Sequence, residues 1–270
     1  MSDIVRQYYD GCVETEWERL ASPYRRFELV STLRLIEEHF PSIGSVADVG
    51  GGPGRYTEEL LRRGYRVSLV DLAPKAIAFA RRRLADKGLE PDLAAAADAR
   101  DLSLLADASF DAGLLLGPMY HIVDAPARQK ALGEFRRILK IGAPGIVGFI
   151  NSWGILRSGL FEFPSCFSDR EHIRQLLETA VQVGEQQAFT EAAFVTPPQA
   201  MAELRTAGFA VEARAGVEGF ASGMLEAVAR LAKEDPDAYA NTLEMVVETC
   251  TWPSYRDCTE HLHVVVRRIS

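Results

Sequence analysis

The chain of 270 residues contains few cysteines and no long apolar run. Its four cysteines are scattered and include no C-x-x-C pair; they are Cys12, Cys166, Cys250 and Cys258. In a chain of this length, such usage indicates reduced thiols in a reducing compartment and not a disulfide framework. No stretch approaches the roughly 20 apolar residues that a membrane span needs. We therefore expect a cytoplasmic protein that has no membrane partner.

Positive charge is also in short supply. The sequence has 30 Lys and Arg against 38 Asp and Glu, a formal net charge of −8. Non-specific binding to nucleic acid depends on clustered Lys and Arg, so we expect no nucleic-acid partner. The arginine runs 81–83 and 136–137 lie on predicted helix faces, where charge is ordinarily solvated. Residues 1–10 lack the apolar run of a secretory signal, and the oligomeric state is left open.

A regular alternation organises residues 45–151. Short apolar runs there alternate with helical patterns, which is typical of βαβ units and a parallel sheet. Length alone favours roughly two domains or one enlarged domain. The first forty residues have a helical pattern, whereas residues 152–200 carry six aromatic side chains without a strand–helix rhythm. Such long segments are usually functional, although a small satellite core is an equal alternative.

A glycine-rich turn, Gly50-Gly51-Gly52-Pro53-Gly54, directly follows the first predicted strand. Glycines permit positive φ angles and remove the Cβ atoms that would block a ligand above the sheet edge. The next helix offers unpaired N–H groups to a negative group. Asp71 follows Gly50 by 21 residues and ends the second strand. A carboxylate in that position can accept hydrogen bonds from the hydroxyls of a ribose.

The same turn lacks the features of dinucleotide and triphosphate sites. A dinucleotide fingerprint has a glycine three positions after its second glycine. Counted from Gly50 and Gly52, that position holds Arg55. No G-x-x-x-x-G-K-[ST] loop occurs in the sequence. The turn therefore suits a nucleoside without a diphosphate better than NAD or ATP, which leaves a nicotinamide oxidoreductase as a remote alternative.

Five segments, in this order, resemble the motifs of the class I S-adenosylmethionine-dependent methyltransferases. They are motif I at 48–54, the acidic second-strand end at Asp71-Leu72, the adenine-contact pair Asp98-Ala99, the strand-four motif at 110–117 and the turn before strand five at 139–145. The last segment reads Leu-Lys-Ile-Gly-Ala-Pro-Gly and departs slightly from the family's turn. Jointly these motifs are specific, and they cover the whole alternating region.

The resemblance implies an α/β fold with a doubly wound, Rossmann-like sheet. That sheet has seven strands, mostly parallel, with an antiparallel last strand. The chain is then one methyltransferase domain in four parts: a helical amino-terminal element at 1–44, the cofactor-binding core at 45–151, a helical and aromatic cap insertion at 152–204, and the C-terminal strands and helices of the core at 205–270.

The resemblance also implies which residues bind S-adenosylmethionine and its product S-adenosylhomocysteine. The implied roles are admission of the methionine and ribose by Gly50, Gly51, Gly52 and Gly54, support from behind the loop by Asp48, ribose binding by Asp71 beside Leu72, adenine contacts from Asp98 and Ala99, ammonium binding by the Leu116 carbonyl, and contacts from Arg19 and Tyr9. In bacterial members an arginine of the amino-terminal element reaches the cofactor carboxylate. Cap or turn roles remain open for Asp48, Gly54 and Asp98.

We expect the chemistry just after strand four, where Tyr120 and His121 are the catalytic candidates. Methyl transfer from a sulfonium is an in-line displacement that depends on alignment and on the exclusion of water. A base is needed only if the acceptor carries a proton that must leave. A structural role for His121 is an equal alternative. His261 and His263 alternate on the last strand beside one carboxylate, which indicates structural histidines and no metal site.

The sequence also indicates which class of molecule accepts the methyl group. Residues 116–119 do not resemble the N/D/S-P-P-Y/F motif of nucleic-acid amino-methylating enzymes, and residues 164–166 are not the Pro-Cys nucleophile of cytosine C5 enzymes. A small molecule is the best remaining acceptor, with the aromatic segment as a cap over the site. Two alternatives stay open: a methyltransferase acting on RNA or protein, with a basic patch around the cofactor mouth, and a non-catalytic regulatory protein that binds the nucleoside.

Overall fold

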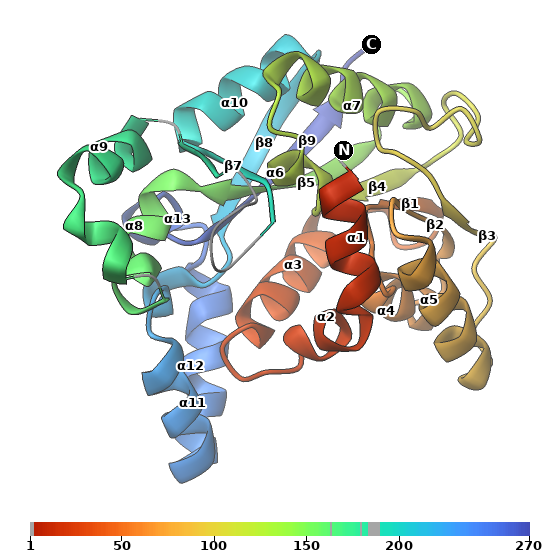
Figure 1. The fold of residues 1–270 in the computed structure, drawn as a ribbon. Coiled ribbons are helices and arrows are strands. Elements are labelled where there is room, and N and C mark those ends of the chain that lie inside the picture. Colours follow the sequence, from red (N-terminus) through yellow and green to blue (C-terminus); the bar gives the residue numbers. More distant parts are fainter. Residues whose placement is uncertain (1–2, 163, 179, 183–189) are drawn as a thin grey trace.

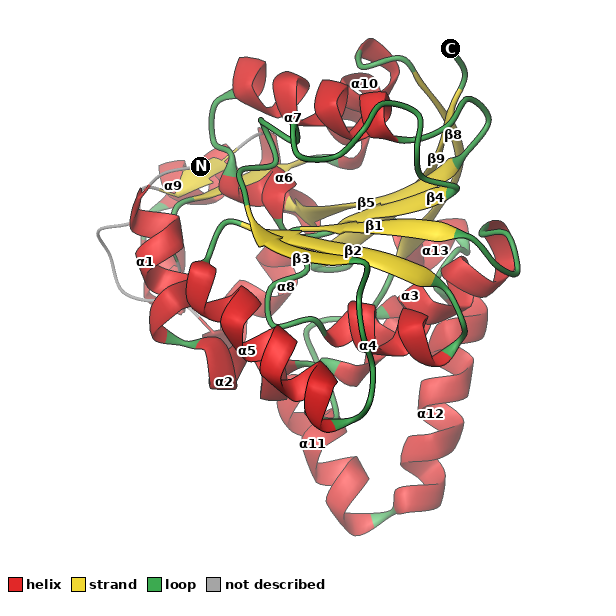
Figure 2. Ribbon diagram, turned by 90° about the vertical axis from the view of Figure 1, so that its right-hand side faces the viewer, coloured by secondary structure: helices red, strands yellow, loops and turns green. Residues whose placement is uncertain are grey.

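The computed structural model describes residues 3–162, 164–178, 180–182 and 190–270. A twisted central sheet has helices on both faces (Figure 1 and Figure 2). Its strands are β1 Ser45–Val49, β2 Arg66–Asp71, β3 Leu93–Ala96, β4 Ala112–Leu115, β5 Pro144–Asn151, β6 Ala180–Gln182, β7 Ala192–Val195, β8 Phe209–Gly216 and β9 His261–Arg268.

The strand order confirms the predicted doubly wound sheet. Strands β3, β2, β1, β4 and β5 are neighbours in that order and run parallel. β9 pairs antiparallel with β5, from Pro144 opposite Arg267 to Ile150 opposite His261, and β8 pairs antiparallel with β9. Since the order of the strands reverses between β1 and β4, a crevice forms at their carboxyl ends, where ligands bind in open α/β sheets.

Two short strands extend the sheet beyond the seven that were predicted. β7 runs parallel to the carboxyl end of β5, with Phe194 opposite Ile150, and β6 pairs antiparallel with β7. These strands include Ala180, Ala192 and Ala193. Alanine has a poor strand propensity, so no local pattern announces a strand here. The hydrogen-bonded pairing of β7 with the end of β5, and of β6 with β7, stabilises the strand conformation that these alanines do not favour by themselves.

Helices surround the sheet, and several have a proline in the first turn, such as Pro74 in α5 and Pro126 in α7, since proline is suited to that position. Their bounds are α1 Asp3–Gly11, α2 Val13–Arg19, α3 Arg26–His39, α4 Arg55–Arg62, α5 Pro74–Asp86, α6 Pro118–His121, α7 Ala125–Ile138, α8 Ser152–Glu162, α9 Arg170–Glu178, α10 Pro197–Thr206, α11 Leu225–Glu234, α12 Pro236–Thr249 and α13 Pro253–Arg256, with short 3₁₀ turns η1 Pro164–Ser168 and η2 Gly219–Ala221. No helix in the described part of the chain has the length and apolar character needed to cross a membrane.

The hydrophobic core has a layer on each face of the sheet. Helices α7 and α10 pack on one face, where Phe135 lies against Gly113 and Gly145. A Cβ atom at either glycine would come within 2.7 or 2.8 Å of the Phe135 ring, so both positions need glycine for packing. Helices α3 and α4 pack on the other face, with Ile36 and Leu60 fully buried. Helices α11 and α12 form a hairpin that projects away from the sheet (Figure 2).

Candidate active site

A pocket lies at the carboxyl ends of β1, β2 and β4, and residues of the amino-terminal helices α1 and α2 also line it. Figure 1 shows the course of these two helices beside the sheet. The pocket brings together most of the residues singled out in the sequence: Tyr9, Arg19, Asp48, Gly50, Gly51, Gly52, Asp71, Leu72, Leu116, Tyr120 and His121. Gly54, Asp98 and Ala99 are not part of its lining. The amino-terminal helix α1 also contributes side chains that no motif indicated, among them Val5 and Arg6.

Three glycines of the turn are required by their backbone conformation, and they differ in what surrounds the position of the missing Cβ atom. Gly50, Gly52 and Gly54 adopt left-handed backbone angles, with φ of +75°, +53° and +84°. A Cβ atom on Gly50 would collide with the ring of Pro118, whereas one on Gly54 would lie 3.1 Å from Ala80 in the next helix. A Cβ atom on Gly52 would meet no protein atom within 4 Å. Only Gly52 therefore leaves open space on the pocket side for a ligand.

Asp71 accepts hydrogen bonds from the turn, and its carboxylate oxygens can still accept hydrogen bonds from a ligand. Its Oδ2 accepts the Gly52 N–H at 2.9 Å, and its Oδ1 accepts the Ala73 N–H at 2.8 Å. Burial raises the pKa of Asp71 to about 6. Each carboxylate oxygen has a second lone pair, so the two backbone bonds leave room for ligand hydroxyls.

Asp48 lies buried behind the turn, as expected. Its Oδ2 accepts the Thr57 hydroxyl at 2.6 Å, which connects the end of β1 to the first turn of α4. Burial raises the pKa of Asp48 to about 6, although the Thr57 hydrogen bond favours the ionised form. The side chain also leaves no space for a Cβ on Gly51, since that atom would be 2.5 Å from Asp48 Oδ2.

Asp98 engages its own turn. Its Oδ2 lies 2.7 Å from Arg100 Nη2, and its Oδ1 accepts the Arg100 backbone N–H at 2.9 Å. Burial opposes ionisation, but these Arg100 contacts hold the pKa of Asp98 well below its usual value. Ala99 is part of the hydrophobic core. The turn role left open for Asp98 is present in the structure, and the adenine contacts of Asp98 and Ala99 stay predictions.

Arg19 reaches the pocket already paired. Its Nη1 lies 2.7 Å from Glu28 Oε2, and its Nε lies 3.2 Å from Glu16 Oε2. Burial disfavours the charge on Glu28, but Arg19 is close enough that the pKa of this carboxyl lies below its usual range. The sequence did not indicate Glu28, because a glutamate inside an amphipathic helix ordinarily faces solvent. Any cofactor carboxylate at Arg19 would share the guanidinium with two glutamates.

His121 and Tyr9 form a buried pair in the same pocket. The Tyr9 Oη atom lies 2.6 Å from His121 Nε2, and His121 Nδ1 lies 3.0 Å from the carbonyl oxygen of Glu191. Because a carbonyl can only accept, Nδ1 carries the proton and Nε2 accepts from the Tyr9 hydroxyl. Burial lowers the pKa of His121 to about 4, so its imidazole is neutral near pH 7. The ring of Tyr120 packs edge-on against the imidazole, with centroids 4.6 Å apart.

Trp17 connects the amino-terminal helix α2 to α4 and α5 next to the pocket through contacts with two arginines. Guanidinium groups of Arg55 and Arg83 each lie 3.9 Å from the centroid of its ring, and Arg55 Nη2 donates to the Trp17 carbonyl oxygen at 2.7 Å. Cation–π contacts between an indole and a partly buried guanidinium contribute about 1 kcal/mol each. The expectation of a solvated Arg83 was wrong, since this side chain packs on a buried indole. Arg55 thus replaces a fingerprint glycine with a contact to α2.

The insertion 152–204 approaches the site through Glu191, whose carbonyl orients His121. Phe194 joins Leu176 and Ile150 in a satellite cluster, which is the alternative that the sequence left open. Phe161 points to solvent instead and is 69% exposed. Two of the six aromatic residues, Phe163 and Phe189, lie outside the described residues.

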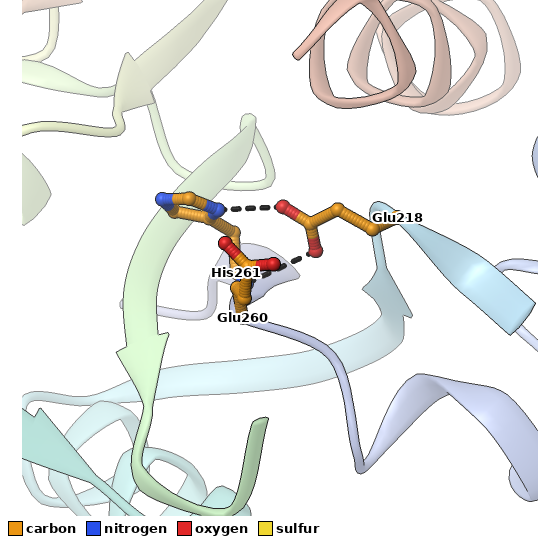
Figure 3. A group of neighbouring side chains, drawn as sticks. All are labelled: Glu218, Glu260 and His261. Atoms are coloured by element: carbon orange, nitrogen blue, oxygen red, sulfur yellow. Dashed lines mark hydrogen bonds and ion pairs between the residues drawn. The ribbon is translucent and has the colours of Figure 1, made fainter. Parts of the chain in front are cut away.

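A second polar cluster joins the end of β8 to the start of β9 (Figure 3). The donor atoms of Glu218, Glu260 and His261 lie within 4.8 Å of one another, close enough to hold a metal ion. Each is already satisfied: His261 contacts Glu218 through Nδ1 at 2.6 Å and through its backbone N–H at 3.1 Å. Glu260 accepts the Tyr24 hydroxyl and lies 2.9 Å from Arg25 Nη1. The Arg25 guanidinium therefore supplies the positive charge that a metal ion would supply in this cluster.

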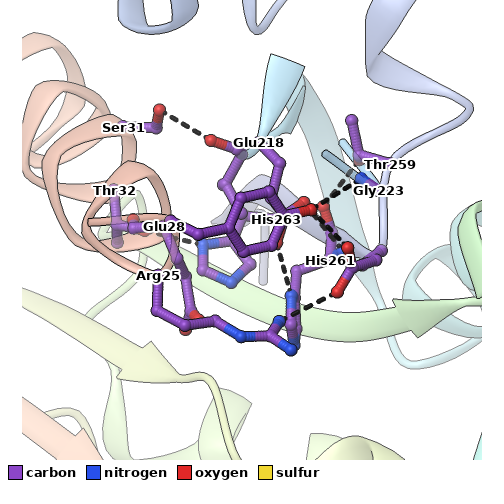
Figure 4. A network of polar contacts seen from close by, with 12 residues as sticks. Arg25, Glu28, Ser31, Thr32, Glu218, Gly223, Thr259, His261 and His263 are labelled. Atoms are coloured by element: carbon purple, nitrogen blue, oxygen red, sulfur yellow. Dashed lines mark hydrogen bonds and ion pairs between the residues drawn. The ribbon is translucent and has the colours of Figure 1, made fainter. Parts of the chain in front are cut away.

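The cluster extends toward the pocket through α3 (Figure 4). The Thr32 hydroxyl lies 2.8 Å from His263 Nδ1, and it donates to the backbone carbonyl of Glu28, the partner of Arg19. Burial lowers the pKa of His263 to about 4; for His261 burial acts in the same direction, but Glu218 raises the pKa above its usual value. The two histidines of β9 thus have opposite charge preferences. The sequence revealed one carboxylate neighbour and missed Glu218, which tertiary packing supplies.

Comparison with known proteins agrees with this geometry. Residues 46–142 match the family described as "Methyltransferase domain". A ubiquinone biosynthesis O-methyltransferase of Xylella fastidiosa (strain 9a5c) is 28% identical over 204 residues, which are 74% of this chain and 76% of that protein. The matched domain and these relatives support a class I S-adenosylmethionine-dependent methyltransferase.

Other relatives of the methyltransferase differ in coverage. A glycine/sarcosine N-methyltransferase of Parasynechococcus marenigrum (strain WH8102) is 32% identical over 144 residues, and the match spans 52% of this chain and 49% of that enzyme. Among solved structures, the 1,6-didemethyltoxoflavin-N1-methyltransferase of Burkholderia thailandensis superposes with a TM-score of 0.60 at 17% identity, over 99% of this chain and 88% of that one. At that identity the likeness concerns the fold alone.

Proposed function

We propose that this methyltransferase transfers the methyl group of S-adenosylmethionine to a small-molecule acceptor that lies against Tyr9 and His121. The observation that carries the proposal is that one pocket holds both the glycine turn and the buried Tyr9–His121 pair. The turn lies at the carboxyl ends of β1 and β2, and the pair lies beside it under α1. A nucleoside cofactor and an acceptor would meet between them. The proposal includes the four parts of a single methyltransferase domain that the sequence predicts.

The residues on the turn side fit the cofactor. Gly52 leaves open the space that a Cβ atom would fill, and Asp71 and Leu72 line the same space at the end of β2. We assign ribose binding to Asp71, and methionyl binding to the Leu116 carbonyl and Arg19. When bound, S-adenosylmethionine supplies a methyl group on a sulfonium that an in-line nucleophile can displace. The chain's own task is to align the acceptor and exclude water.

The charge of the lining favours a small acceptor over a macromolecule. Three arginines (Arg6, Arg19 and Arg55) face four carboxylates (Glu16, Glu28, Asp48 and Asp71) in the described lining. An RNA or an acidic protein segment would need an excess of positive charge at the cofactor mouth. The curated relatives are named for ubiquinone biosynthesis and for glycine and sarcosine, which are small-molecule activities. The free thiols of Cys12, Cys250 and Cys258 support a reducing, cytoplasmic location.

The Tyr9–His121 pair can receive a proton from the acceptor. The Glu191 carbonyl holds the Nδ1–H tautomer, so Nε2 keeps a lone pair directed at the Tyr9 hydroxyl. A proton that leaves an acceptor hydroxyl or amine passes to the Tyr9 oxygen while the Tyr9 proton moves to Nε2. Because burial lowers the pKa of His121 to about 4, full protonation is unfavourable before the methyl group moves. The pair therefore orients the acceptor first and takes its proton late.

Cofactor binding by titration calorimetry tests the turn side. Gly52→Ala places a methyl group in the open space, so we expect the Kd for S-adenosylmethionine to rise about a hundredfold, roughly 2.7 kcal/mol. Gly88→Ala is the matched control, because Gly88 also has a left-handed φ, +68°, and no atom within 4 Å of its Cβ position, but lies at the end of α5. Absence of binding by the unmodified chain, or equal affinities of the two variants, would contradict the proposal.

Catalysis is tested separately by a screen of a metabolite library with radiolabelled S-adenosylmethionine. We expect label to appear in a small organic acceptor. Cofactor binding without transfer to any small molecule, RNA or protein pool would instead support a non-catalytic regulatory protein. Transfer only to RNA or protein would support the macromolecular alternative.

A further inference from the structure

A second groove lies between α8 and the start of α11, and it shares no lining residue with the cofactor pocket. Its volume is about 510 Å³. Ligand pockets in proteins usually measure about 300–1,000 Å³, so the groove is large enough for a small organic molecule. Nothing in the proposed methyl transfer uses this groove.

One part of the groove is apolar. Leu160 and Phe161 of α8 are 57% and 69% exposed, and Met224 and Leu225, at the start of α11, are 47% and 40% exposed. All four line the groove, so the exposed apolar side chains gather in one place on two helices. Contiguous apolar surface of this kind marks binding sites more often than isolated exposed residues do.

The other part of the groove is positive. Arg157 of α8 and Arg230 of α11 both line it, together with one carboxylate, Glu226. Within the described residues, neither guanidinium lies in an ion pair; Arg157 makes one long contact, 3.6 Å, to the sulfur of Cys258. The two arginines and the one glutamate give the lining a net positive charge, although the net charge of the whole chain is −8. Guanidinium groups bind carboxylates and phosphates through paired N–H donors.

Ser222 supplies an independent sign of a ligand. This residue lines the groove, is only 1% exposed, and its hydroxyl has no hydrogen-bond partner among the described residues. A buried hydroxyl without a hydrogen-bond partner is destabilising. The adjacent backbone is held in place, because the Gly223 N–H donates to the Tyr24 oxygen at 2.7 Å. Rotation of the Ser222 side chain toward the groove would let its hydroxyl donate to a ligand oxygen.

We propose that the groove between α8 and α11 binds an amphipathic anion. A carboxylate or phosphate head lies between Arg157 and Arg230 and accepts a hydrogen bond from Ser222, while an aliphatic chain covers Phe161 and Met224. The same chemistry occurs in a free fatty acid and in the headgroup region of an anionic lipid. The proposal commits to the free molecule, and it does not depend on the proposed methyl transfer.

Titration of the full chain with decanoate tests the proposal, with decanol and acetate as partial probes. We expect saturable decanoate binding that is at least tenfold tighter than binding of either partial probe, since each lacks one half of the ligand. Substitution of both Arg157→Gln and Arg230→Gln should weaken decanoate binding at least tenfold. The control is Arg174→Gln on α9, an exposed arginine outside the groove. S-adenosylmethionine binding, measured on the same samples, shows that the variants are folded.

Two outcomes would overturn the proposal. Equal affinities for decanoate and decanol, or decanoate binding that the double substitution leaves unchanged, would reduce the groove to a non-specific apolar patch. Sedimentation with phosphatidylglycerol vesicles but not with phosphatidylcholine vesicles, combined with no saturable decanoate binding, would identify a membrane surface as the partner. Ser222→Ala should give a smaller loss of decanoate affinity, about fivefold, and an unchanged affinity would remove the hydroxyl from the site.

Discussion

The two sides of the proposed cofactor pocket are built in different ways. On the turn side, Gly50 and Gly52 directly follow β1 and Asp71 ends the neighbouring strand β2, and the decisive hydrogen bond, from Gly52 to Asp71, joins residues 19 apart. On the helical side, the contact between Tyr9 and His121 joins residues 112 apart. The turn side follows from local backbone geometry, so a motif reveals it. The helical side exists only because α1 and α2 pack over the sheet edge.

The contact that keeps the two sides together is also long-range. Trp17 of α2 lies between Arg55, directly after the glycine turn, and Arg83 of α5. Arg55 and Arg83 each had an ordinary interpretation in the sequence, as the residue in place of a fingerprint glycine and as a solvated arginine, and no motif indicated a contact of either with Trp17. Together they determine which segment covers the pocket. The comparison between the two sides therefore makes predictions about both and about this contact.

The largest effect is expected from the helical side. Tyr9→Phe removes the hydroxyl that links the acceptor to His121, so kcat should fall about a thousandfold, the middle of the range for general acid–base catalysis. The affinity for S-adenosylmethionine should not change, as measured by calorimetry. Tyr8→Phe is the control, because Tyr8 packs edge-on against Tyr9 but does not line the pocket. A loss of cofactor affinity with unchanged kcat would place Tyr9 on the cofactor side, where the sequence resemblance put it.

The pH dependence of stability tests the burial of His121. Its pKa is about 4 when folded and about 6.5 when unfolded, so between these values the unfolded chain binds one more proton. Acidification from pH 6.5 to 4 should therefore remove about 3 kcal/mol more from the free energy of unfolding of the unmodified chain than from that of His121→Gln, since His263, which titrates in the same direction, is present in both.

Urea unfolding of both proteins at pH 7 and pH 4 measures this difference. Asp48 and Asp71 act with the opposite sign, because their raised pKa values stabilise the folded state as the pH falls through about 6. Both carboxylates are present in both proteins, so their contributions cancel in the comparison. The same pH dependence with and without His121 would show that this imidazole is not buried.

A moderate effect is expected where the two sides are joined. Trp17→Leu keeps an apolar side chain but removes the close cation–π contacts of Arg55 and Arg83 and the longer one of Lys87, so the free energy of unfolding should fall by about 2 kcal/mol. Amide hydrogen exchange in α1 and α2 should accelerate more than exchange in β1 and β4. Trp252→Leu is the control, because this indole is 52% exposed and lies outside the pocket. Uniform acceleration throughout the chain would mean that Trp17 supports the whole fold and not this contact.

The smallest effect is expected at Asp98. If its role is to brace the turn with Arg100, Asp98→Ala and Arg100→Ala should raise the cofactor Kd by a similar small factor. One net hydrogen bond contributes about 1 kcal/mol, which is roughly fivefold. A larger loss in Asp98→Ala alone, measured by calorimetry, would support the adenine contact that the resemblance implies.

Much of the sheet was predictable because its signals are local. Apolar runs identified β1, β2 and β5, and Pro74 marked the start of α5. The strands β6 and β7 were not predictable, because their alanines acquire strand geometry only through pairing with β5. Part of the site escaped prediction for a related reason. Glu28 and Glu218 are ordinary glutamates in the sequence and become buried, paired carboxylates only in the folded chain.

The sequence by itself determined the class of fold, the family and the shape of the glycine turn. These depend on backbone conformations that glycine, proline and periodic apolar residues specify through near neighbours. Tertiary structure alone decided that α1 and α2 line the pocket, that Glu191 sets the tautomer of His121, and that Arg157 and Arg230 face a common groove. Burial and partnership set the charge state and donor role of a side chain. Both are properties of the packed chain and not of the residue type.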